Sequence, residues 1–550
     1  MITYKAVSDN NTVILYNSMG DRQVVSNLPE ALDFLCKYRN QGFICFWDLD
    51  HSLATILSIL PRNQLTQMLS YWELDNLPDK SQEQKDTKLG ILRIMREWMS
   101  VWEINYKEDR RLRIVKDYNW KGCTWVFNLK QFFADDVQEP ELVEMAKMGQ
   151  TMVDAVNGMR GMQKGGVDMI SSAGAIAVSL LNSLDLPADS NLGEGYDMIG
   201  EAYRYCQGKP WQETHRLGYF PAGMCTDYDT TRAHSYQLAS LIDFRKGKWY
   251  ISPQPPTRSF YGVAFGHIYI EAPVSPIMYR TAGGHFNPVG DWWDWITKEE
   301  IETIYRWKLG TFRAQKGMWF VPTEKENGKP LRGLMHYLYD LRTHPILGSI
   351  AKKVANSVWG LMLYERGTYK GKYHNPTWGS VVEANERCSV ANFVYAYDLQ
   401  DKLVNISTDG CLAITDMQLP PDNNNGIGKW RSEPAGEVLS VSSTFVFHGQ
   451  ARPNGITLTE ALESVRSQPQ ESSWQLGKTR LLSIPDLQHT AYRPRIGHKE
   501  GFGIAPSANL DRKFKPMPAL GSDLLTNVYN SVPWKIHSQA QESEVVIHMG

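Results

Sequence analysis

An acidic side chain at the tip of an expected β-hairpin is the first residue whose setting could support chemistry. The stretch DKLVNISTDGCLAI, residues 401–414, has two short apolar runs separated by Ser407, Thr408, Asp409 and Gly410, which are residue types of a tight turn. Burying an unpaired carboxylate costs several kcal/mol, so this pattern indicates either a metal ligand or a side chain that caps its own turn. The hairpin alone leaves both interpretations open.

Two further segments gain meaning only in combination with this hairpin. The run CTDYDTTRAHSYQLASL, residues 225–241, is typical of a short strand carrying Asp229, followed by the start of an amphipathic helix. The run PILGSIAKKVANSVWG, residues 345–360, predicts a helix. Lys352, Asn356 and Trp359 would share one face of that helix, because they lie at positions i, i+4 and i+7.

In order and content, these segments resemble the polymerase motifs of family B DNA polymerases, most closely the protein-primed replicases of bacteriophages and linear plasmids. The family has an Asp followed by SLYP, then KxxxNSxYG, then DTDS; here YDTTRAHSYQL, KKVANSVWG and NISTDG stand in their places. The resemblance implies that Asp229 and Asp409 bridge the catalytic metals, while Ser407 replaces an acid that does not bridge them. It also implies that Lys352, with Arg342 in YDLRTHP, contacts the triphosphate.

Nucleotidyl transfer explains these residue types. Attack of a 3′-hydroxyl on an α-phosphate passes through a charged in-line transition state, which two Mg²⁺ or Mn²⁺ ions about 3.5–4 Å apart would stabilise. The two cations would neutralise the leaving pyrophosphate as the fingers close. The expected cofactors are therefore two Mg²⁺ or Mn²⁺ ions. The expected partners are a DNA template and primer, deoxynucleoside triphosphates and, from the protein-primed resemblance, a terminal priming protein.

Other matching residues would line the substrate site. His234 stands where the family has the tyrosine that stacks under the incoming sugar, and Trp359 stands at the family's second-motif tyrosine. The smaller histidine could either relax discrimination against a 2′-hydroxyl or fill the same space. Nucleotide contacts are also expected at Thr230 and Asn356. DNA contacts are expected at Ser357, Gly360 and Thr408.

Departures from the family pattern leave the activity open. The lysine of the family's KxY motif is missing from VSSTFVF, where Ser443, Thr444 and Phe445 occupy its place. Together with Ser407, this loss is compatible with an impaired but active polymerase or with a catalytically silent nucleic-acid-binding subunit. NPTWGSVVEANER, which ends at Arg387, resembles the palm helix that leads into the third motif.

The N-terminal region occupies the place of the family's 3′–5′ exonuclease, in which four carboxylates hold two metals. FWDLDHSLATILSILP resembles its second motif, with Asp48 at the usual Asn and Ser52 where the acid should be. KMGQTMVDAV retains Asp154 but has Gln150 at the usual Tyr, and Asp9 is a poor substitute for the first motif. One carboxylate of four cannot assemble a two-metal site, so we expect proofreading to be lost.

Two segments could contact nucleic acid outside these motifs. GGHFNPVGDWWDW lies where the protein-primed enzymes insert a segment that contacts the priming protein and DNA, and its tryptophans suit either base stacking or core packing. These are Trp292, Trp293 and Trp295. LDRKFKPMPAL suits either a thumb that grips duplex phosphates or a solvated basic loop. Its cations are Arg512, Lys513 and Lys515.

The overall composition limits the class of protein that carries these motifs. A chain of 550 residues is too long for one core, and 21% charged with 42% hydrophobic residues is typical of a soluble globular protein. At a net charge of -2, cations that bind a polyanion would have to gather on one face. Seven cysteines without CxxC spacing indicate reduced thiols and a cytoplasmic protein. If the protein is phage-encoded, that cytoplasm would be the host cell's. The sequence shows neither a leader pattern nor a long apolar run, so we expect neither secretion nor a membrane span.

The alternation of elements predicts an α/β N-terminal domain. Strands are expected at 12–16, 43–46 and 125–128. Helices are expected at 53–60 and 89–102, and from 140 to 184 with a break at GMRGMQKGG. Gly and Pro between 208 and 223 suggest a junction between domains.

We therefore expect a multidomain α/β and α+β protein with the right-hand polymerase arrangement. Its segments would be an RNase H-like, degenerate exonuclease domain (1–208), a palm with an inserted segment (209–340), a fingers helix region (341–366), the completion of the palm (367–436), and a thumb with a C-terminal tail (437–550). The expected function is template-directed DNA synthesis for a phage or mobile element. The alternatives are the silent subunit and a polymerase able to use ribonucleotides.

Overall fold

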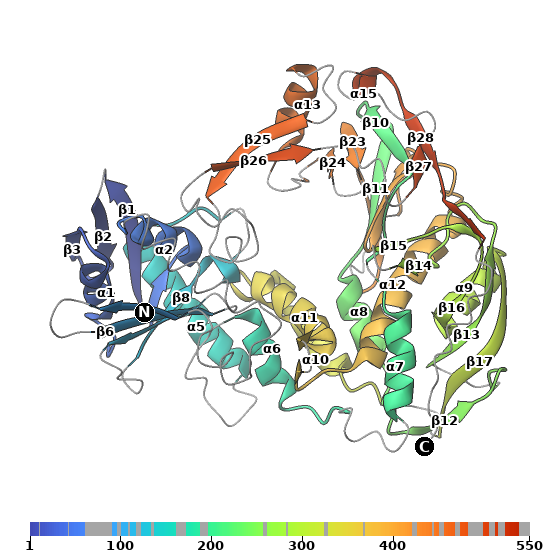
Figure 1. The fold of residues 1–550 in the computed structure, drawn as a ribbon, viewed down its shortest axis with the longest axis horizontal. Coiled ribbons are helices and arrows are strands. Elements are labelled where there is room, and N and C mark those ends of the chain that lie inside the picture. The colour runs from blue at the N-terminus through green and yellow to red at the C-terminus, as the bar shows by residue number, and fades with distance from the viewer. Residues whose placement is uncertain are drawn as a thin grey trace. The chain divides into compact units, whose positions relative to one another are not determined.

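The structure is a computed structural model (Figure 1). It describes residues 1–537 apart from 10–11, 42, 61–90, 96–100, 108–110, 117–122, 134–136, 161–171, 188–195, 209, 257–260, 282–283, 324–327, 367–368, 421–425, 443–444, 450, 452–455, 468–473, 482–498, 505–511 and 515–522. The chain divides into two compact units. The first contains Met1–Ser183, Leu341–Val354 and Lys478–Gly501, and the second contains Leu184–Asp340, Ala355–Gly477 and Phe502–Gly550. The five finer segments expected from the sequence remain predictions.

The first unit is built on one eight-stranded sheet with the strand order β3-β2-β1-β4-β8-β7-β6-β5. The pairs β1–β4 and β4–β8 are parallel and the others are antiparallel. The strands are β1 Ile2–Asp9, β2 Thr12–Asn17, β3 Arg22–Val25, β4 Ile44–Phe46, β5 Ile91–Met95, β6 Val101–Lys107, β7 Arg111–Lys116 and β8 Thr124–Asn128. The helices are α1 Leu28–Cys36, α2 Leu49–Leu57, α5 Leu142–Arg160, α6 Ala173–Leu181 and the short 3-10 helices Lys130–Phe132 and Leu341–Thr343.

Most elements expected in this region are confirmed. The three expected strands correspond to β2, β4 and β8, the first expected helix overlaps α2, and α5 and α6 lie within the expected helical stretch from 140 to 184. The helix expected at 89–102 is wrong, because β5 and β6 form an antiparallel pair there. A short run of apolar residues fits the periodicity of a helix as well as that of a strand. Pairing with a neighbouring strand decides between the two structures. The break at GMRGMQKGG lies largely outside the described residues.

The second unit contains three five-stranded sheets, with the orders β24-β23-β10-β28-β27, β22-β11-β21-β20-β9 and β12-β17-β13-β16-β29. Their strands are β9 Gln212–Thr214, β10 Arg216–Phe220, β11 Cys225–Thr230, β12 Gly247–Ile251, β13 Tyr261–Ile270, β16 Val289–Thr297, β17 Gly310–Pro322, β20 Leu403–Ser407, β21 Gly410–Ile414, β22 Trp430–Pro434, β23 Val438–Ser442, β24 Phe445–His448, β27 Lys513–Phe514, β28 Tyr529–Val532 and β29 Lys535–His537. Two small hairpins pair β14 Tyr279–Thr281 with β15 Gly284–Phe286 and β18 Glu365–Arg366 with β19 Tyr369–Lys370. The Gly- and Pro-rich stretch from 208 to 223 lies inside this unit, where it carries β9 and β10.

Helices cover the sheets of the second unit. They are α7 Tyr196–Cys206, α8 Ala233–Ser240, α9 Lys298–Arg306, α10 Arg332–Asp340, α12 Pro376–Ala396, α13 Leu458–Ser467 and α15 Asp523–Thr526. Three elements have residues in both units, namely α11 Leu347–Leu363, β25 Trp474–Leu481 and β26 Lys499–Ile504. Among the helices of the described residues, none combines the length and apolar character needed to cross a lipid bilayer.

The buried helix α12 supports the hairpin that opened the sequence analysis. Asn375 caps its N-terminus by accepting a hydrogen bond from the Trp378 N–H, and Pro376 occupies its first turn. Val390 and Phe393 then pack in one core with the apolar residues of β20 and β21, among them Ile406. The hairpin itself is confirmed, with Ser407 opposite Gly410 at its closed end.

Candidate functional site

The structure brings Asp229 and Asp409 to one edge of a sheet. Asp229 lies on β11, opposite Gly410 of β21 in the antiparallel register, and Asp409 lies in the two-residue turn between β20 and β21. The Thr230 N–H donates a hydrogen bond to the Asp409 carbonyl oxygen at 3.2 Å. Two acids separated by 180 residues therefore sit on neighbouring strand ends.

The turn that carries Asp409 is fixed by backbone contacts from a third strand. Thr408 has a φ of 57°, a conformation that costs a β-branched residue energy unless its surroundings hold it. Its N–H donates to the Trp211 carbonyl oxygen at 2.7 Å, just before β9, which pairs with β20. Trp211 is buried, and its indole N–H donates to Glu213. The position of the acid is thus set by tertiary contacts as well as by the turn residues.

Arg431 contacts the first acid. It lies opposite Asp229 in the register of β11 and β22, and its Nε and Nη2 donate to Oδ2 of Asp229 at 3.1 and 2.6 Å. This hydrogen bond raises the pKa of Arg431. Asp227, two residues earlier on β11, has a raised pKa because of burial, and the charge of Asp229 adds to the shift. The sequence contains no motif that marks Arg431, because its role follows from strand register.

His234 lies in a buried contact with a glutamate that the motifs did not single out. Its Nδ1 is 3.0 Å from Oε1 of Glu386, whose side chain is 5% exposed. Burial, followed by the charge of Asp409, raises the pKa of Glu386 well above its usual range, and burial lowers the pKa of His234. Burial thus disfavours the charged form of both side chains. The ring of His234 meets Trp359 edge-on, with centroids 5.1 Å apart.

The helix α11 confirms the helix expected at 345–360. The candidate site residues on this helix belong to two different units. Trp359 is half-buried in the second unit, where Asn356 and Gly360 are exposed and Ser357 is half-buried. Lys352 is exposed and belongs to the first unit. Arg342 also belongs to the first unit and is exposed. The triphosphate contacts of both cations remain predictions.

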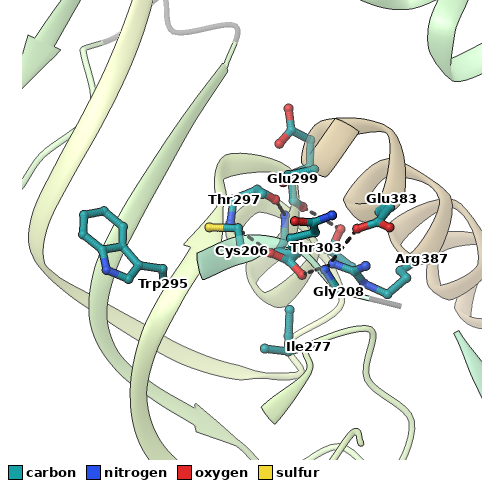
Figure 2. A network of polar contacts seen from close by, with 12 residues as sticks. Cys206, Gly208, Ile277, Trp295, Thr297, Glu299, Thr303, Glu383 and Arg387 are labelled. Carbon is teal, nitrogen blue, oxygen red and sulfur yellow. Dashed lines mark hydrogen bonds and ion pairs between the residues drawn. The ribbon is translucent and has the colours of Figure 1, made fainter. Parts of the chain in front are cut away.

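A buried polar network around Glu383 and Arg387 holds α12 (Figure 2). The same helix carries Glu386. Nη2 of Arg387 contacts Oε1 of Glu300 on α9 at 2.8 Å, and Thr297 and Glu300 form a capping box at the start of α9. Glu383, one turn before Arg387, accepts a hydrogen bond from the Gly208 N–H at 3.0 Å. Burial raises the pKa of Glu383 to about 7. Arg387, which ends the palm-helix resemblance, is thus a buried anchor of this helix.

The donor set suits magnesium held with help from a substrate. Within the part of the chain that the structure describes, no group of three or more His, Cys, Asp or Glu side chains is placed to hold a metal ion. Mg²⁺ is usually bound by one or two carboxylates together with waters and substrate phosphates. Asp229 and Asp409 place two carboxylates at one strand edge. The residue types present there therefore fit Mg²⁺.

The residues at the exonuclease-like motif positions make local structural contacts. Asp48 caps α2 by accepting from the His51 N–H, and it forms an ion pair with Lys130 at 3.2 Å. Gln150 donates to Asp154 at 3.0 Å and accepts from the N-terminal amine. Ser52 is buried on α2, and Asp9 ends β1.

The basic segment near the C-terminus gives a correction. Arg512 is 4% exposed and pairs with Glu213 at 3.0 Å, while also donating to the Pro273 carbonyl oxygen and to Ser531. It is therefore a buried tether, and the expected contact with a DNA phosphate is wrong for this residue. Lys513 is exposed, with its ammonium 5.7 Å from the ring centre of Trp534. Lys515 lies outside the described residues, as do Ser443 and Thr444.

Core packing accounts for two of the three tryptophans. Trp292 and Trp295 are buried, whereas Trp293 is 36% exposed. Alternation along β16 explains the contrast between Trp292 and Trp293, because neighbouring residues of a strand point to opposite faces.

Among solved structures, this chain is similar to Phi29 DNA polymerase. The ternary complex with primer-template DNA and incoming nucleotide substrates matches with a TM-score of 0.53 and 11% identity, covering 92% of this chain and 100% of that chain. An orthorhombic crystal form matches with a TM-score of 0.48 and 12% identity, covering 80% and 85%. No protein-family model and no curated protein sequence matches the chain. The ternary complex thus shows that this mixed α/β, multidomain chain has a DNA-polymerase-like fold, and its chemistry must be argued from its residues.

Proposed function

We propose that the protein is a template-directed DNA polymerase that joins nucleotides with the help of two divalent cations. The observation that carries the proposal is the meeting of Asp229 and Asp409 at one sheet edge in a chain with a polymerase-like fold. Core packing does not require two acids at this sheet edge, whereas carboxylate oxygens are the ligands that Mg²⁺ and Mn²⁺ prefer. Divalent cations held there would stabilise the in-line transition state of phosphoryl transfer.

The other residues then take roles around this pair. Lys352 and Arg342 would bind the triphosphate and neutralise the leaving pyrophosphate. His234 and Trp359 would lie under the incoming nucleotide, and Asn356 would contact it. Further nucleotide and DNA contacts are proposed at Thr230, Ser357, Gly360, Thr408 and Lys513.

The finer architecture belongs to the same proposal. The second unit would hold the palm and thumb, and the first would hold an exonuclease-type domain without proofreading, since Asp48 and Asp154 already have local partners. DNA template, primer and deoxynucleoside triphosphates would be the substrates. Replication of a phage or mobile element, with a terminal priming protein, follows from the motif resemblance.

Primer extension on a primed single-stranded template tests the proposal. We expect extension with Mg²⁺ or Mn²⁺, and its loss by at least a hundredfold in Asp229→Asn and Asp409→Asn, while binding of the primed template is retained. Asp416→Asn is the matched control, because it removes an exposed carboxylate just beyond β21 and away from the turn. Extension that survives both active-site substitutions would contradict the proposal.

A catalytically silent nucleic-acid-binding subunit is the second candidate. The contact of Arg431 with Asp229 favours it, because a guanidinium already neutralises the acid that a metal would need. Template binding without extension, under either metal and with a protein primer present, would support this candidate. The Ser407→Asp variant, which restores the acid of the family pattern, shows whether Ser407 is the cause.

A further inference from the structure

The sheet β12-β17-β13-β16-β29 has one face covered by a helix and one face partly open. On the covered face, Ile268 of β13 and Trp292 of β16 pack in one core with Ile304 of α9. The next residue along each strand points the other way, and there Tyr269 is 39%, Trp293 36% and His267 33% exposed.

The strand register places aromatic and basic side chains side by side on this open face. His267 lies opposite both Trp293 and Arg313, and Phe265 lies opposite Lys316. The ring of Trp293 is 5.9 Å from that of Phe265 and 5.5 Å from that of His267, centroid to centroid. We call these residues the aromatic–basic face: Phe265, His267, Tyr269, Trp293, Arg313 and Lys316.

Two cations of this face have no acidic partner among the described residues. Arg313 is exposed and Lys316 half-buried, and within the described ranges neither forms an ion pair with an acid. Two acids lie near this face: Asp291 contacts His267 at 3.7 Å and His537 at 3.0 Å, and Glu271, just beyond β13, accepts a hydrogen bond from the Tyr269 hydroxyl at 3.5 Å. A protein with a net charge of -2 thus presents unpaired cations beside exposed rings. Folding does not require this arrangement, because exposed aromatic rings forgo the stabilisation that burial would give.

We propose that the aromatic–basic face binds single-stranded nucleic acid, with bases stacked on Trp293, Tyr269 and Phe265 and phosphates held by Arg313 and Lys316. Aromatic rings on an open sheet bind unpaired bases by stacking, and nearby cations neutralise the backbone. A duplex would hide its base faces from these rings. An apolar protein partner would leave the two cations without counter-charges, so the charge complementarity favours a polyanion. This site is separate from the Asp229 and Asp409 pair and does not depend on their activity.

Photocrosslinking locates the binding independently of any template channel. A short single-stranded thymidine oligonucleotide that carries 5-iododeoxyuridine is irradiated with the full-length protein, and the cross-linked peptides are identified by mass spectrometry. We expect cross-links at Trp293 or Tyr269. Cross-links confined to other peptides would overturn the proposal.

Affinity measurements with the same oligonucleotide complete the test. One stacked base is worth about 1–3 kcal/mol, so Trp293→Ala should weaken binding roughly tenfold, and Arg313→Glu should weaken binding and reduce its dependence on salt. The matched controls are Tyr250→Ala and Lys248→Glu, which change exposed residues on β12 at the edge of the same sheet. Equal affinity in Trp293→Ala, Arg313→Glu and the parent protein would also overturn the proposal. Asp409→Asn should abolish extension yet keep the cross-links, so the polymerase proposal and this one can fail separately.

Discussion

Arg431 and Asp229 form a cross-strand ion pair at the candidate metal site, and the pair would compete with a divalent cation. We expect Arg431→Gln to bind Mn²⁺ more tightly than the parent protein, because one oxygen of Asp229 is released. Both side chains are partly exposed, so an energy of about 0.2–1 kcal/mol predicts only a gain of about 1.4- to fivefold in affinity. Mn²⁺ binding measured by electron paramagnetic resonance checks this without substrate. Lys402→Gln, which removes an exposed cation just before β20, is the control, and unchanged affinity in Arg431→Gln would show that the pair does not compete.

Glu386 is predicted to set the position of His234. Removal of the carboxyl in Glu386→Ala leaves Nδ1 of His234 without this partner and opens space beside the ring that meets Trp359. If the protein polymerises, we expect Glu386→Ala to change the ratio of ribonucleotide to deoxynucleotide incorporation several-fold, while Glu386→Gln keeps it near the parent value. His234→Tyr should lower ribonucleotide use. Incorporation ratios that are equal in all four proteins would refute a role for this pair in sugar choice.

At the scale of elements, the approach of β11 to the β20–β21 hairpin depends on Gly410. A Cβ at this position would lie against the carbonyl oxygen of Tyr228, which belongs to a paired strand and cannot rotate away. Gly410→Ala should therefore push the hairpin from β11, separate the two acids, and lower both extension and thermal stability. Gly333→Ala on α10, where a Cβ meets open space, is the control and should leave stability unchanged or slightly raised. A parent-like melting temperature in Gly410→Ala would contradict this account.

The network around α12 predicts a pH dependence. Burial raises the pKa of Glu383 to about 7 from its ordinary value of 4.5, so the folded state favours the neutral carboxyl. Its stabilising contribution is present below pH 4.5 and is lost as the pH rises through about 7. The free energy of unfolding should fall over that interval, and Glu383→Gln, which cannot ionise but can still accept from Gly208, should flatten the fall. Urea unfolding at pH 5 and pH 8 measures the difference, and identical slopes in both proteins would exclude Glu383 as its source.

At the scale of the whole molecule, buried charges tie distant parts of the second unit together. Arg512 joins the C-terminal region to Glu213 on β9, 299 residues away. Removal of Arg512 would leave the buried Glu213 with contacts to Trp211 and His215 but without its guanidinium. Arg512→Met should lower the free energy of unfolding by about 3–5 kcal/mol. Lys513→Met, at the exposed neighbour, should change it little. Denaturant unfolding compares the two, and a small loss in Arg512→Met would mean that Glu213 finds another partner.

Local patterns determined many of the elements around the site. The hairpin at 401–414, the helix at 345–360 and the strand with Asp229 could be predicted because each has a clear period of apolar residues and recognisable turn residues. The order of these segments also pointed to the polymerase-like fold that the structural likeness supports. The helix predicted at 89–102 is wrong, because a short apolar run does not reveal whether a neighbouring strand will pair with it, as β5 and β6 do.

Tertiary structure decided which side chains surround the acids. Arg431 meets Asp229 through strand register, and Glu386 meets His234 through the packing of α12, so neither contact has a signature in the local sequence. The same holds for Arg512, whose basic neighbourhood suggested an exposed cation although its partner lies at Glu213. By itself, the sequence determined the elements and the residue types available for chemistry. Only long-range packing decided which charges are paired, buried or left open to a ligand, because those energies depend on contacts between residues far apart in the chain.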